Sequence, residues 1–545
     1  MSAPVLEIAN LSVAIKGIGD RPHAVRGINL AVAANEIVCV VGESGSGKSV
    51  TAQAVMGLLP KNAMAVETGS IRLEGEELTA KSDADLRATR GTRMAMVFQE
   101  PMTALNPVER VGDQIGEVLE VHTDLDPRER RKRVLDIMRA VHLPDPEQMI
   151  NAYPHQLSGG QRQRIMIAAA LVLDPALLIA DEPTTALDVT TQAQILKLVR
   201  EMQARRKTGV LFITHDFGVV SEIADRVVVM QLGRIVEQGA TEEVLRNPRE
   251  EYTRMLLASV PSMTPPKRVP VSGPVVLQTE RLFKTYGKRS LFQPKARIVN
   301  AVNDVSLEVR RGETLGIVGE SGSGKSTVAR CVARLVEPTS GAIRIDNADV
   351  AAIKEAKFRP IRRRVQFIFQ DPYRSLNPRR TVGEAIIEGP MNFGLTRGEA
   401  LQRARDLMAV VHLSPEAIDR YPHQFSGGQR QRICIARALA MEPELLIGDE
   451  PVSALDVSVQ AQVLRLLDEV RRRFNLAVLF ITHDLRVAAQ VCDRIAVMQR
   501  GVIVEQGTTS EVFAAPRHEY TRALFEAAPG RNREFIAGGA AGARS

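Results

Sequence analysis

The sequence predicts an α/β fold that occurs twice in one chain. Two observations carry this prediction: long segments recur at matching spacings, and short apolar runs alternate with helical patterns. The length of 545 residues agrees with it. A domain takes roughly 100–200 residues, so the chain has room for about three to five folding units.

Four pairs of segments reveal the internal repeat. The first copies are FQEPMTALNP (98–107), YPHQLSGGQRQR (153–164), DEPTTALDV (181–189) and FITHD (212–216). The second copies are FQDPYRSLNP (369–378), YPHQFSGGQRQR (421–432), DEPVSALDV (449–457) and FITHD (480–484). In both halves the serine of SGGQ, the glutamate of DEP and the histidine of THD are separated by 24 and then 33 residues. Such a repeat predicts two homologous domains.

The domain boundaries follow from the repeat and from composition. We expect a first domain over 1–260, a linker over 261–274, a second domain over 275–529 and a tail over 530–545. Five prolines within 260–274 predict a stiff, extended linker. The tail is rich in Gly, Ala and Arg, which predicts disorder.

The elements of the first half follow in chain order, and the second half copies the plan. We expect strands over 36–41, 176–180 and 210–214 and helices over 49–59, 128–142 and 161–173. The last two strands are continuously apolar, as in a parallel sheet buried on both faces. Helical sequence over about 100–157, and over about 371–425 in the second half, interrupts the alternation and predicts an inserted helical subdomain.

Composition excludes several classes of protein. The net charge of +7 is small for this length, and aromatic residues make up 4% with no Trp, which argues against a platform for single-stranded nucleic acid. Four widely separated cysteines exclude a disulfide scaffold and a zinc ribbon. The N-terminus does not resemble a signal peptide, and the longest apolar run falls short of the ~18 residues of a membrane helix. We expect a soluble protein that can still dock on a membrane protein.

A phosphate-binding loop occurs once in each half. GESGSGKS fits GxxxxGK[ST] between a strand and a helix, and its glycines let backbone N–H groups surround phosphate oxygens. Lys48 and Lys325 would reach the β- and γ-phosphates, and Ser49 and Ser326 would hold Mg²⁺. A chance Gly-rich turn does not explain two copies in register. The expected nucleotide-binding residues of the loops are Gly42, Glu43, Ser44, Gly45, Ser46, Gly47, Lys48, Ser49 and Val50, and Gly319, Glu320, Ser321, Gly322, Ser323, Gly324, Lys325, Ser326 and Thr327.

Paired acids end one strand in each half. Asp181 and Asp449 are expected at the carboxyl ends of their strands, where each can hold Mg²⁺ through water. Glu182 and Glu450 follow them and would polarise the attacking water. A lone acidic pair would be read as two solvated side chains, but the upstream phosphate loop favours the catalytic interpretation.

Further polar residues follow other strands. Gln99 and Gln370 open the helical insertions and can bind Mg²⁺ or water. Taken alone, each would be an ordinary surface amide. His215 and His483 follow the strand VLFIT and can hydrogen-bond a γ-phosphate, although a histidine that caps a strand end is the alternative for either one alone.

The SGGQ segments each open a helix. A serine followed by glycines makes an anion-binding helix N-terminus, although the spacing alone favours a simple cap. Recurrence 24 residues before each acidic pair favours the functional interpretation. The expected residues are Ser158, Gly159, Gly160 and Gln161, and Ser426, Gly427, Gly428 and Gln429. Asp188 and Asp456 follow the acidic pairs, and an N-cap is their alternative role.

This ordered set of motifs, present twice, resembles the nucleotide-binding domains of ABC transporters over nearly the whole chain outside the linker and tail. The resemblance implies tandem P-loop NTPase domains, each a mainly parallel sheet with an inserted helical subdomain. It also implies that ATP lies between the phosphate loop of one domain and the SGGQ of the other. Site one would then take Ser426 and Gly428 from the second half, and site two would take Ser158 and Gly160 from the first.

The resemblance extends to a subfamily. YPHQ, the LNP after the glutamine, NPREEYTRMLL (247–257) and APRHEYTRALF (515–525) are similar to the oligopeptide/dipeptide/nickel importer ATPases. The fusion of two ATPases is similar to that in the microcin C and glutathione importers. Apart from this likeness, each EYTR segment predicts only an amphipathic terminal helix.

The resemblance implies an ATP hydrolase that drives import, with ATP and Mg²⁺ as its ligands. Its partners would be two transmembrane permease subunits and an extracytoplasmic substrate-binding protein, at the cytoplasmic face of the bacterial inner membrane. The segments after Gln99 and Gln370 would be the docking surface. The main alternative is a soluble tandem ATPase of translation or DNA repair, and an exporter motor is a third.

Three departures from the family pattern distinguish this chain. An aromatic residue that stacks on adenine is matched by Tyr286 in the second half, but Ile15 takes its place in the first, which predicts weaker nucleotide binding at site one. Val50 stands where the second half has Thr327. Some members carry an iron–sulfur centre after the first ATPase, and the lack of cysteine between Cys39 and Cys331 predicts none here.

Overall fold

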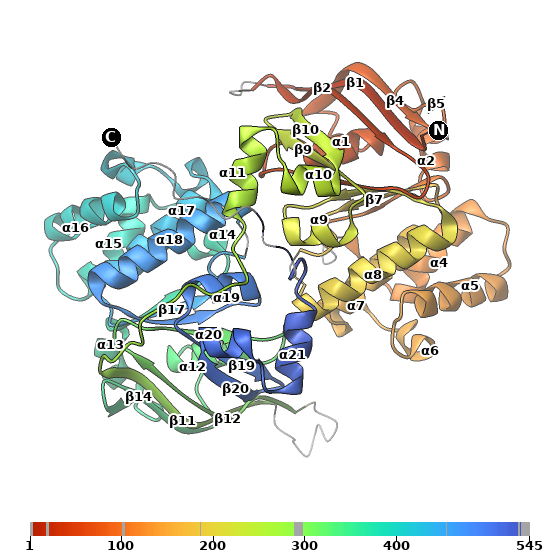
Figure 1. The fold of residues 1–545 in the computed structure, drawn as a ribbon. Helices are drawn as coiled ribbons and strands as arrows, with labels where there is room; N and C mark the ends of the chain where they lie inside the picture. Colours follow the sequence, from red (N-terminus) through yellow and green to blue (C-terminus); the bar gives the residue numbers. More distant parts are fainter. Residues whose placement is uncertain are drawn as a thin grey trace. The chain divides into compact units, whose positions relative to one another are not determined.

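The chain forms two compact units in a computed structural model (Figure 1). The structure describes residues 4–17, 21–100, 104–185, 187–287, 298–453, 455–531, 533 and 535. The first unit contains Met1–Val260 together with the chain from Pro529 onward, and the second contains Pro261–Ala528. Each unit therefore corresponds to one copy of the sequence repeat. The exception is the chain from Pro529 onward, which follows the second copy but belongs to the first unit.

A six-stranded sheet forms the centre of the first unit. Its strands, in the order β10-β9-β3-β8-β7-β6, are β10 (Arg234–Ala240), β9 (Arg226–Gln231), β3 (Ile37–Val41), β8 (Gly209–Ile213), β7 (Leu177–Asp181) and β6 (Met94–Val97). All pairs are parallel except β9 with β10. Every residue of β3, β7 and β8 is buried, which confirms the parallel sheet that their apolar runs predict.

A second, antiparallel sheet was not predicted. It has the order β2-β1-β4-β5, with β1 (Leu6–Ile15), β2 (His23–Val32), β4 (Met64–Leu73) and β5 (Glu76–Glu77). Its buried side chains share one core with α1 (Lys48–Val55) and one face of the six-stranded sheet. The expectation of a single mainly parallel sheet therefore has to be extended. β1 and β2 mix buried and exposed residues, so they lack the continuous apolar runs that identify buried strands.

Helices cover the other face of the six-stranded sheet. They are α7 (Gly159–Leu171), α8 (Val189–Arg206), α9 (Phe217–Ile223) and α10 (Thr241–Arg246). Between β6 and α7 the described chain forms α4 (Val111–His122), α5 (Pro127–Ala140) and α6 (Pro146–Met149), which share the core of this face. Residues 101–103 of the expected helical insertion lie outside the described residues. The remaining helices are α2 (Asp83–Thr89) and α11 (Glu251–Ser259).

The second unit repeats this plan. Its antiparallel sheet contains β12 (Val299–Arg310), β11 (Val275–Tyr286), β14 (Ser340–Ile345) and β15 (Ala348–Asp349). Its six-stranded sheet contains β16 (Val365–Ile368), β17 (Leu445–Asp449), β18 (Ala477–Ile481), β13 (Thr314–Val318), β19 (Arg494–Gln499) and β20 (Val502–Thr508). Its helices are α12 (Lys325–Val332), α13 (Glu355–Arg362), α14 (Pro372–Ser375), α15 (Val382–Asn392), α16 (Arg397–Val410), α17 (Gly427–Leu439), α18 (Val457–Phe474), α19 (Leu485–Val491), α20 (Thr509–Ala514) and α21 (Glu519–Glu526).

The expected linker over 261–274 has no helix or strand, but it packs on the second unit. Gln490 of α19 donates a hydrogen bond to the Ser262 carbonyl at 2.9 Å. Arg268 forms an ion pair with Asp493 at 3.1 Å. These contacts make the segment part of the second unit instead of a free spacer.

The first residues of the expected disordered tail are ordered, so the prediction is wrong there. The Gly530 N–H donates to Glu222 of α9 at 3.0 Å, and Arg533 pairs with Glu242 of α10. Phe535 is 9% exposed and lies in the core of the first unit. Residues 536–545 of the expected tail lie outside the described residues.

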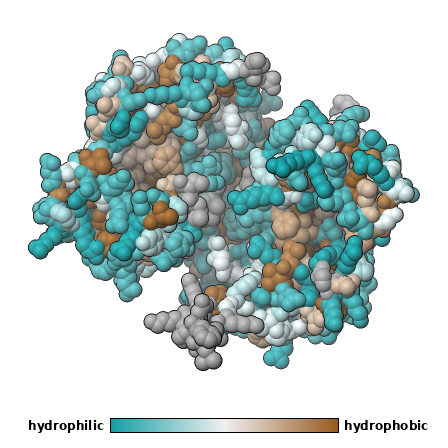
Figure 2. All heavy atoms as spheres, turned by 180° about the vertical axis from the view of Figure 1, so that it is seen from behind, coloured by the Kyte–Doolittle hydropathy of each residue, from teal (hydrophilic) through white to brown (hydrophobic). Residues whose placement is uncertain are grey.

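Among the described residues, no helix is long and apolar enough to cross a bilayer. Figure 2 shows a mostly hydrophilic face on which hydrophobic residues form separate patches.

Candidate functional site

Glycines shape the phosphate loop between β3 and α1. Gly42 and Gly47 have φ of 149° and 104°. A Cβ at Gly42 would lie 2.2 Å from the Met230 carbonyl oxygen, and one at Gly47 would lie 2.8 Å from that of Ala24. These two positions therefore require glycine. The second unit repeats this geometry at Gly319 and Gly324, with φ of 149° and 107°.

The lysine of each loop is buried and held by the loop backbone. Lys48 is 6% exposed, and its Nζ donates to the carbonyl oxygens of Gly42 at 2.7 Å and Glu43 at 3.0 Å. Lys325 makes the two equivalent bonds at 2.7 Å each. The ammonium thus lies beside the N-terminus of a helix, where negative charge is favoured.

A serine and an aspartate meet in each unit, as expected for a Mg²⁺ site. Ser49 Oγ donates to Asp181 Oδ1 at 3.0 Å, and Ser326 Oγ donates to Asp449 Oδ1 at 2.7 Å. Burial raises the pKa of both aspartates, which a bound cation would counteract. The donor set is oxygen only, which suits Mg²⁺.

Glu182 is the centre of a polar cluster in the first unit. Gln99 Nε2 donates to its carboxylate at 2.9 Å, His215 Nδ1 lies 3.3 Å from it, and the Thr185 hydroxyl donates at 2.9 Å. Burial raises the pKa of Glu182, but the hydrogen bond and charge of His215, with Thr185, outweigh it and lower the pKa to about 2. Glu182 also has φ of 48°, an uncommon conformation for a glutamate, which is typical of functional sites.

The second unit builds the same cluster around Glu450, with φ of 51°. Gln370 Nε2 donates to its carboxylate at 2.9 Å, and His483 Nδ1 lies 3.1 Å away. Burial lowers the pKa of His483, but the hydrogen bond and charge of Glu450 outweigh it, so the pKa lies above its usual value. The structure therefore brings together in each unit the glutamate, glutamine and histidine that the sequence singled out.

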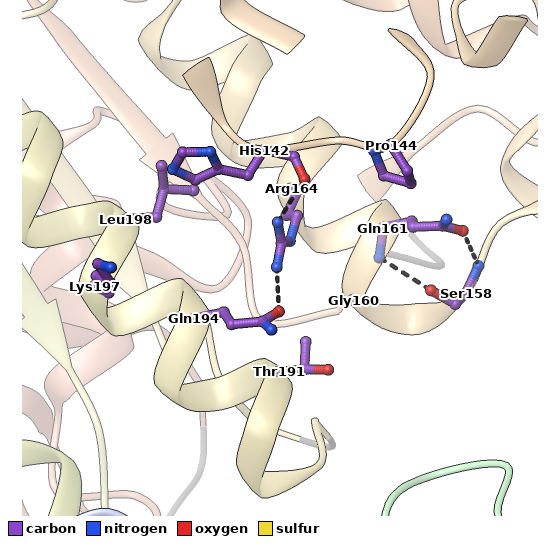
Figure 3. Close-up of a pocket in the computed structure, with 10 residues that line it drawn as sticks. All are labelled: His142, Pro144, Ser158, Gly160, Gln161, Arg164, Thr191, Gln194, Lys197 and Leu198. Carbon is purple, nitrogen blue, oxygen red and sulfur yellow. Dashed lines mark hydrogen bonds between the residues drawn. The ribbon is translucent and has the colours of Figure 1, made fainter. Parts of the chain in front are cut away.

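The SGGQ segments begin α7 and α17 as capping boxes. Ser158 accepts from the Gln161 N–H, and the Gln161 side chain accepts from the Ser158 N–H; Ser426 and Gln429 do the same. Ser158 and Gln161 line a pocket of about 590 Å³ together with Arg164, Thr191 and Gln194, which Figure 3 draws as sticks.

The second glycine of each SGGQ is required by a helix crossing. A Cβ at Gly160 would lie 2.4 Å from Thr191, and one at Gly428 would lie 2.1 Å from Val459. Among the described residues, no hydrogen bond or ion pair joins either SGGQ serine to the phosphate loop of its own unit.

Two other predicted pairs lie at element ends. Asp188 is the N-cap of α8 and accepts from the Thr191 N–H at 2.9 Å, and Asp456 holds the N-cap position of α18. Tyr286 and Ile15 are the last residues of the equivalent strands β11 and β1. Tyr286 is 40% exposed, and Lys284 Nζ lies over its ring, 5.0 Å from the centroid.

Sequence reasoning missed several residues near the site. Arg330 lies 3.8 Å from Asp449, and Thr185 donates to Glu182 as described above. The hydroxyls of Tyr252 and Tyr520 contact the phosphate loops. The identical EYTR segments were a signal for the tyrosines, whereas nothing in the sequence alone marks Arg330.

The family models match both repeats. The model described as "ABC transporter" matches residues 25–185 and 302–453. The model "Oligopeptide/dipeptide transporter, C-terminal region" matches 236–289 and 504–537. The chain belongs to the ABC transporter family. It is an ATP-binding subunit of an importer in this family, and it hydrolyses ATP to drive transport.

Curated relatives match this ABC transporter ATPase over almost its full length. The glutathione import ATP-binding protein GsiA of Salmonella paratyphi A is 46% identical, over 97% of this chain and 90% of that protein. The protein of the same name from Escherichia coli O6:H1 is 46% identical, over 96% and 89%. A solved ATP-binding cassette dimer bound to ADP and Pi is 27% identical, with a TM-score of 0.40, over 43% of this chain and 98% of that chain. The alternative of a soluble ATPase of translation or DNA repair finds no support in these comparisons.

Proposed function

We propose that the two repeats of this ABC ATPase pair head to tail, so that each ATP lies between the phosphate loop of one repeat and the SGGQ of the other. The observation that carries this proposal is the doubled and complete set of site groups. Each unit has its own buried lysine, its serine–aspartate pair and its Glu–Gln–His cluster. Both sites are therefore competent for hydrolysis.

Within each site the chain's groups divide the work. The loop N–H groups with Lys48 or Lys325 bind the phosphates, and Glu182 or Glu450 polarises the attacking water. The low pKa of Glu182 keeps it ionised at neutral pH, so it accepts the hydrogen bond of that water. Mg²⁺, held by Ser49, Asp181 and Gln99 or by Ser326, Asp449 and Gln370, would neutralise phosphate charge when bound.

Replacing both glutamates tests these roles. The Glu182→Gln, Glu450→Gln double variant should bind ATP but hydrolyse it about 10²–10⁴-fold more slowly, since the water loses its acceptor. Each single variant should keep the activity of its intact site. Wild-type turnover in the double variant, measured by phosphate release, would reject the assignment.

The proposed partners are two permease subunits and an extracytoplasmic substrate-binding protein, at the cytoplasmic face of the bacterial inner membrane. Exposed apolar side chains next to the segments after Gln99 and Gln370 support a docking surface: Val108 is 78% exposed and Tyr373 is 61% exposed. Purification of the tagged chain from membranes should yield permeases. Ribosomes or DNA in their place would overturn this proposal.

The proposed cargo is a short peptide of the size of glutathione. The support comes from the similarity to glutathione import ATP-binding proteins and from the match to the oligopeptide/dipeptide transporter family at the end of each repeat. The test is uptake by proteoliposomes that contain the assembled complex. Labelled glutathione and labelled dipeptides are supplied separately, and uptake of one but not the other identifies the cargo. Uptake of neither would reject this cargo class.

A further inference from the structure

We propose that Tyr252 and Tyr520 are positioning residues for the lysines of the two phosphate loops. Both belong to the EYTR segments that begin α11 and α21. Tyr252 Oη accepts a hydrogen bond from the Glu43 N–H at 3.2 Å, and Tyr520 Oη accepts one from the Glu320 N–H at 3.1 Å. The terminal helix of each repeat thus holds the loop that lies 209 or 200 residues earlier in the chain.

The tyrosine and the lysine bind opposite sides of one peptide group. The peptide between Gly42 and Glu43 donates its N–H to Tyr252, and its carbonyl accepts from Lys48 Nζ at 2.7 Å. A peptide group is planar, so a rotation that breaks one of these bonds also displaces the other. The two bonds also polarise each other.

This peptide needs an external restraint because it follows a glycine. Gly42 has no side chain, and its φ of 149° lies where glycine alone moves freely. The sterics of the residue itself therefore do not fix the orientation of the peptide. The tyrosine hydroxyl supplies the restraint, and the same arrangement recurs at Gly319 with Glu320 and Tyr520.

The tyrosine is in turn held by the core. Tyr252 is half-buried and packs against the main hydrophobic cluster of the first unit. Leu256 and Leu257 of the same helix are buried, as are Leu524 and Phe525 of α21. Because the helix is fixed on the core, its tyrosine hydroxyl has a fixed position from which it restrains the loop.

The expected consequence rests on the proposed function, in which Lys48 binds the β- and γ-phosphates. Loss of the hydroxyl should weaken binding of ATP, which has those phosphates, and should leave AMP binding unchanged. Retention of the ring should preserve the packing of α11. The Tyr→Phe change therefore separates positioning from packing.

The experiment uses the full chain with site two disabled by Lys325→Ala. Binding of ATP and AMP is measured by calorimetry with and without Tyr252→Phe. We expect ATP affinity to fall about two- to tenfold, because the hydroxyl accepts from the Glu43 N–H at 3.2 Å and also donates to the Glu43 carboxylate at 3.3 Å, with AMP affinity and the thermal midpoint of the nucleotide-free protein unchanged. Met255→Ala, on an exposed position of the same helix, is the matched control and should change none of these.

Two results with Tyr252→Phe would overturn the inference. One is an unchanged ATP affinity in Tyr252→Phe. The other is an equal loss of ATP and AMP binding with a lower thermal midpoint, which would assign the tyrosine to packing alone. If the Lys325→Ala parent itself bound no ATP, the proposed nucleotide site would be rejected, and the positioning role with it. Tyr520→Phe in a Lys48→Ala parent repeats the test for the other loop.

Discussion

Site one and site two share all the charged groups of the proposed phosphate and water chemistry, but they differ in neighbouring residues. The first site has Ile15, Gln53 and Thr185 where the second has Tyr286, Arg330 and Ser453. Thr185 donates to the Glu182 carboxylate, whereas Ser453 donates to the backbone carbonyl of Glu450 at 3.1 Å. The differences therefore concern how tightly each site holds its ligands and its glutamate, and the groups that perform the reaction are the same.

The largest expected difference concerns the segments that follow the two EYTR helices and how much each stabilises the unit on which it packs. Phe535→Ala should lower the free energy of unfolding of α9 and α10 by about 3 kcal/mol. This is the low end of the range for truncating a buried phenylalanine. Lys267 occupies the equivalent position after the first EYTR segment and is exposed. Lys267→Ala should change stability by less than about 0.5 kcal/mol. Hydrogen exchange over residues 217–246 measures the effect, and equal protection in both variants would contradict it.

The adenine position should set the next largest difference. Ile15→Tyr in a Lys325→Ala parent should tighten ATP binding at site one roughly two- to tenfold, because an aromatic contact contributes about 0.5–1.5 kcal/mol. Tyr286→Ile in a Lys48→Ala parent should weaken site two by a similar factor. Calorimetry compares the two parents directly. Equal ATP affinities of the two parents would show that the exchange of Tyr286 for Ile15 does not affect ATP binding.

A smaller difference is expected in Mg²⁺ affinity. Arg330 lies 3.8 Å from Asp449, and the first unit has Gln53 at the equivalent position. Arg330→Gln should lower the Mg²⁺ concentration needed at site two by about fivefold, since the half-exposed Arg330 guanidinium forms a long ion pair with the buried Asp449 carboxylate, and such a pair contributes about 1 kcal/mol. Gln53→Arg should have the opposite effect at site one. A Mg²⁺ titration of ATP binding in the single-site parents checks both, and a change in the reverse direction would exclude this electrostatic role.

The smallest expected effect is a shift in the pKa of His483. The raised pKa of His483 depends on Glu450, whereas burial alone would lower it. The pair stabilises the fold fully below the pKa of an unfolded histidine, and this stabilisation is lost as the pH rises through the raised folded pKa. Glu450→Gln should move the His483 pKa below its usual value. NMR titration of labelled histidines follows it, and an unmoved pKa would mean that Glu450 does not control this proton.

The sequence predicted the polar groups that meet in each unit better than it predicted the residues that support them. Contiguous motifs singled out Lys48, Asp181 and Glu182, because the proposed chemistry requires those side chains at fixed spacing. The contacts of Tyr252 with the phosphate loop span 209 residues and depend on tertiary packing that no local pattern encodes. The antiparallel sheet was missed for a related reason, since its strands are only half-buried.

The described residues at the start of the expected tail were mispredicted because composition and packing disagree there. Residues 530–545 are rich in Gly, Ala and Arg, but a single phenylalanine, Phe535, reaches the core of the first unit. Gly218 of α9 makes room for this segment, since a Cβ there would lie 2.8 Å from the Pro529 carbonyl oxygen. A low average hydrophobicity does not exclude one anchoring residue.

The place of this segment in the first unit affects the order of events during synthesis. The chain from Pro529 onward belongs to the first unit, yet it leaves the ribosome after all of the second unit. Domains usually fold as they emerge, N-terminal first. Here the first unit completes its packing only after the whole of the second unit has been synthesised, so a chain that stops at Ala528 leaves the surface of α9 and α10 uncovered. The first ATPase unit can therefore finish folding only after the second unit has been synthesised.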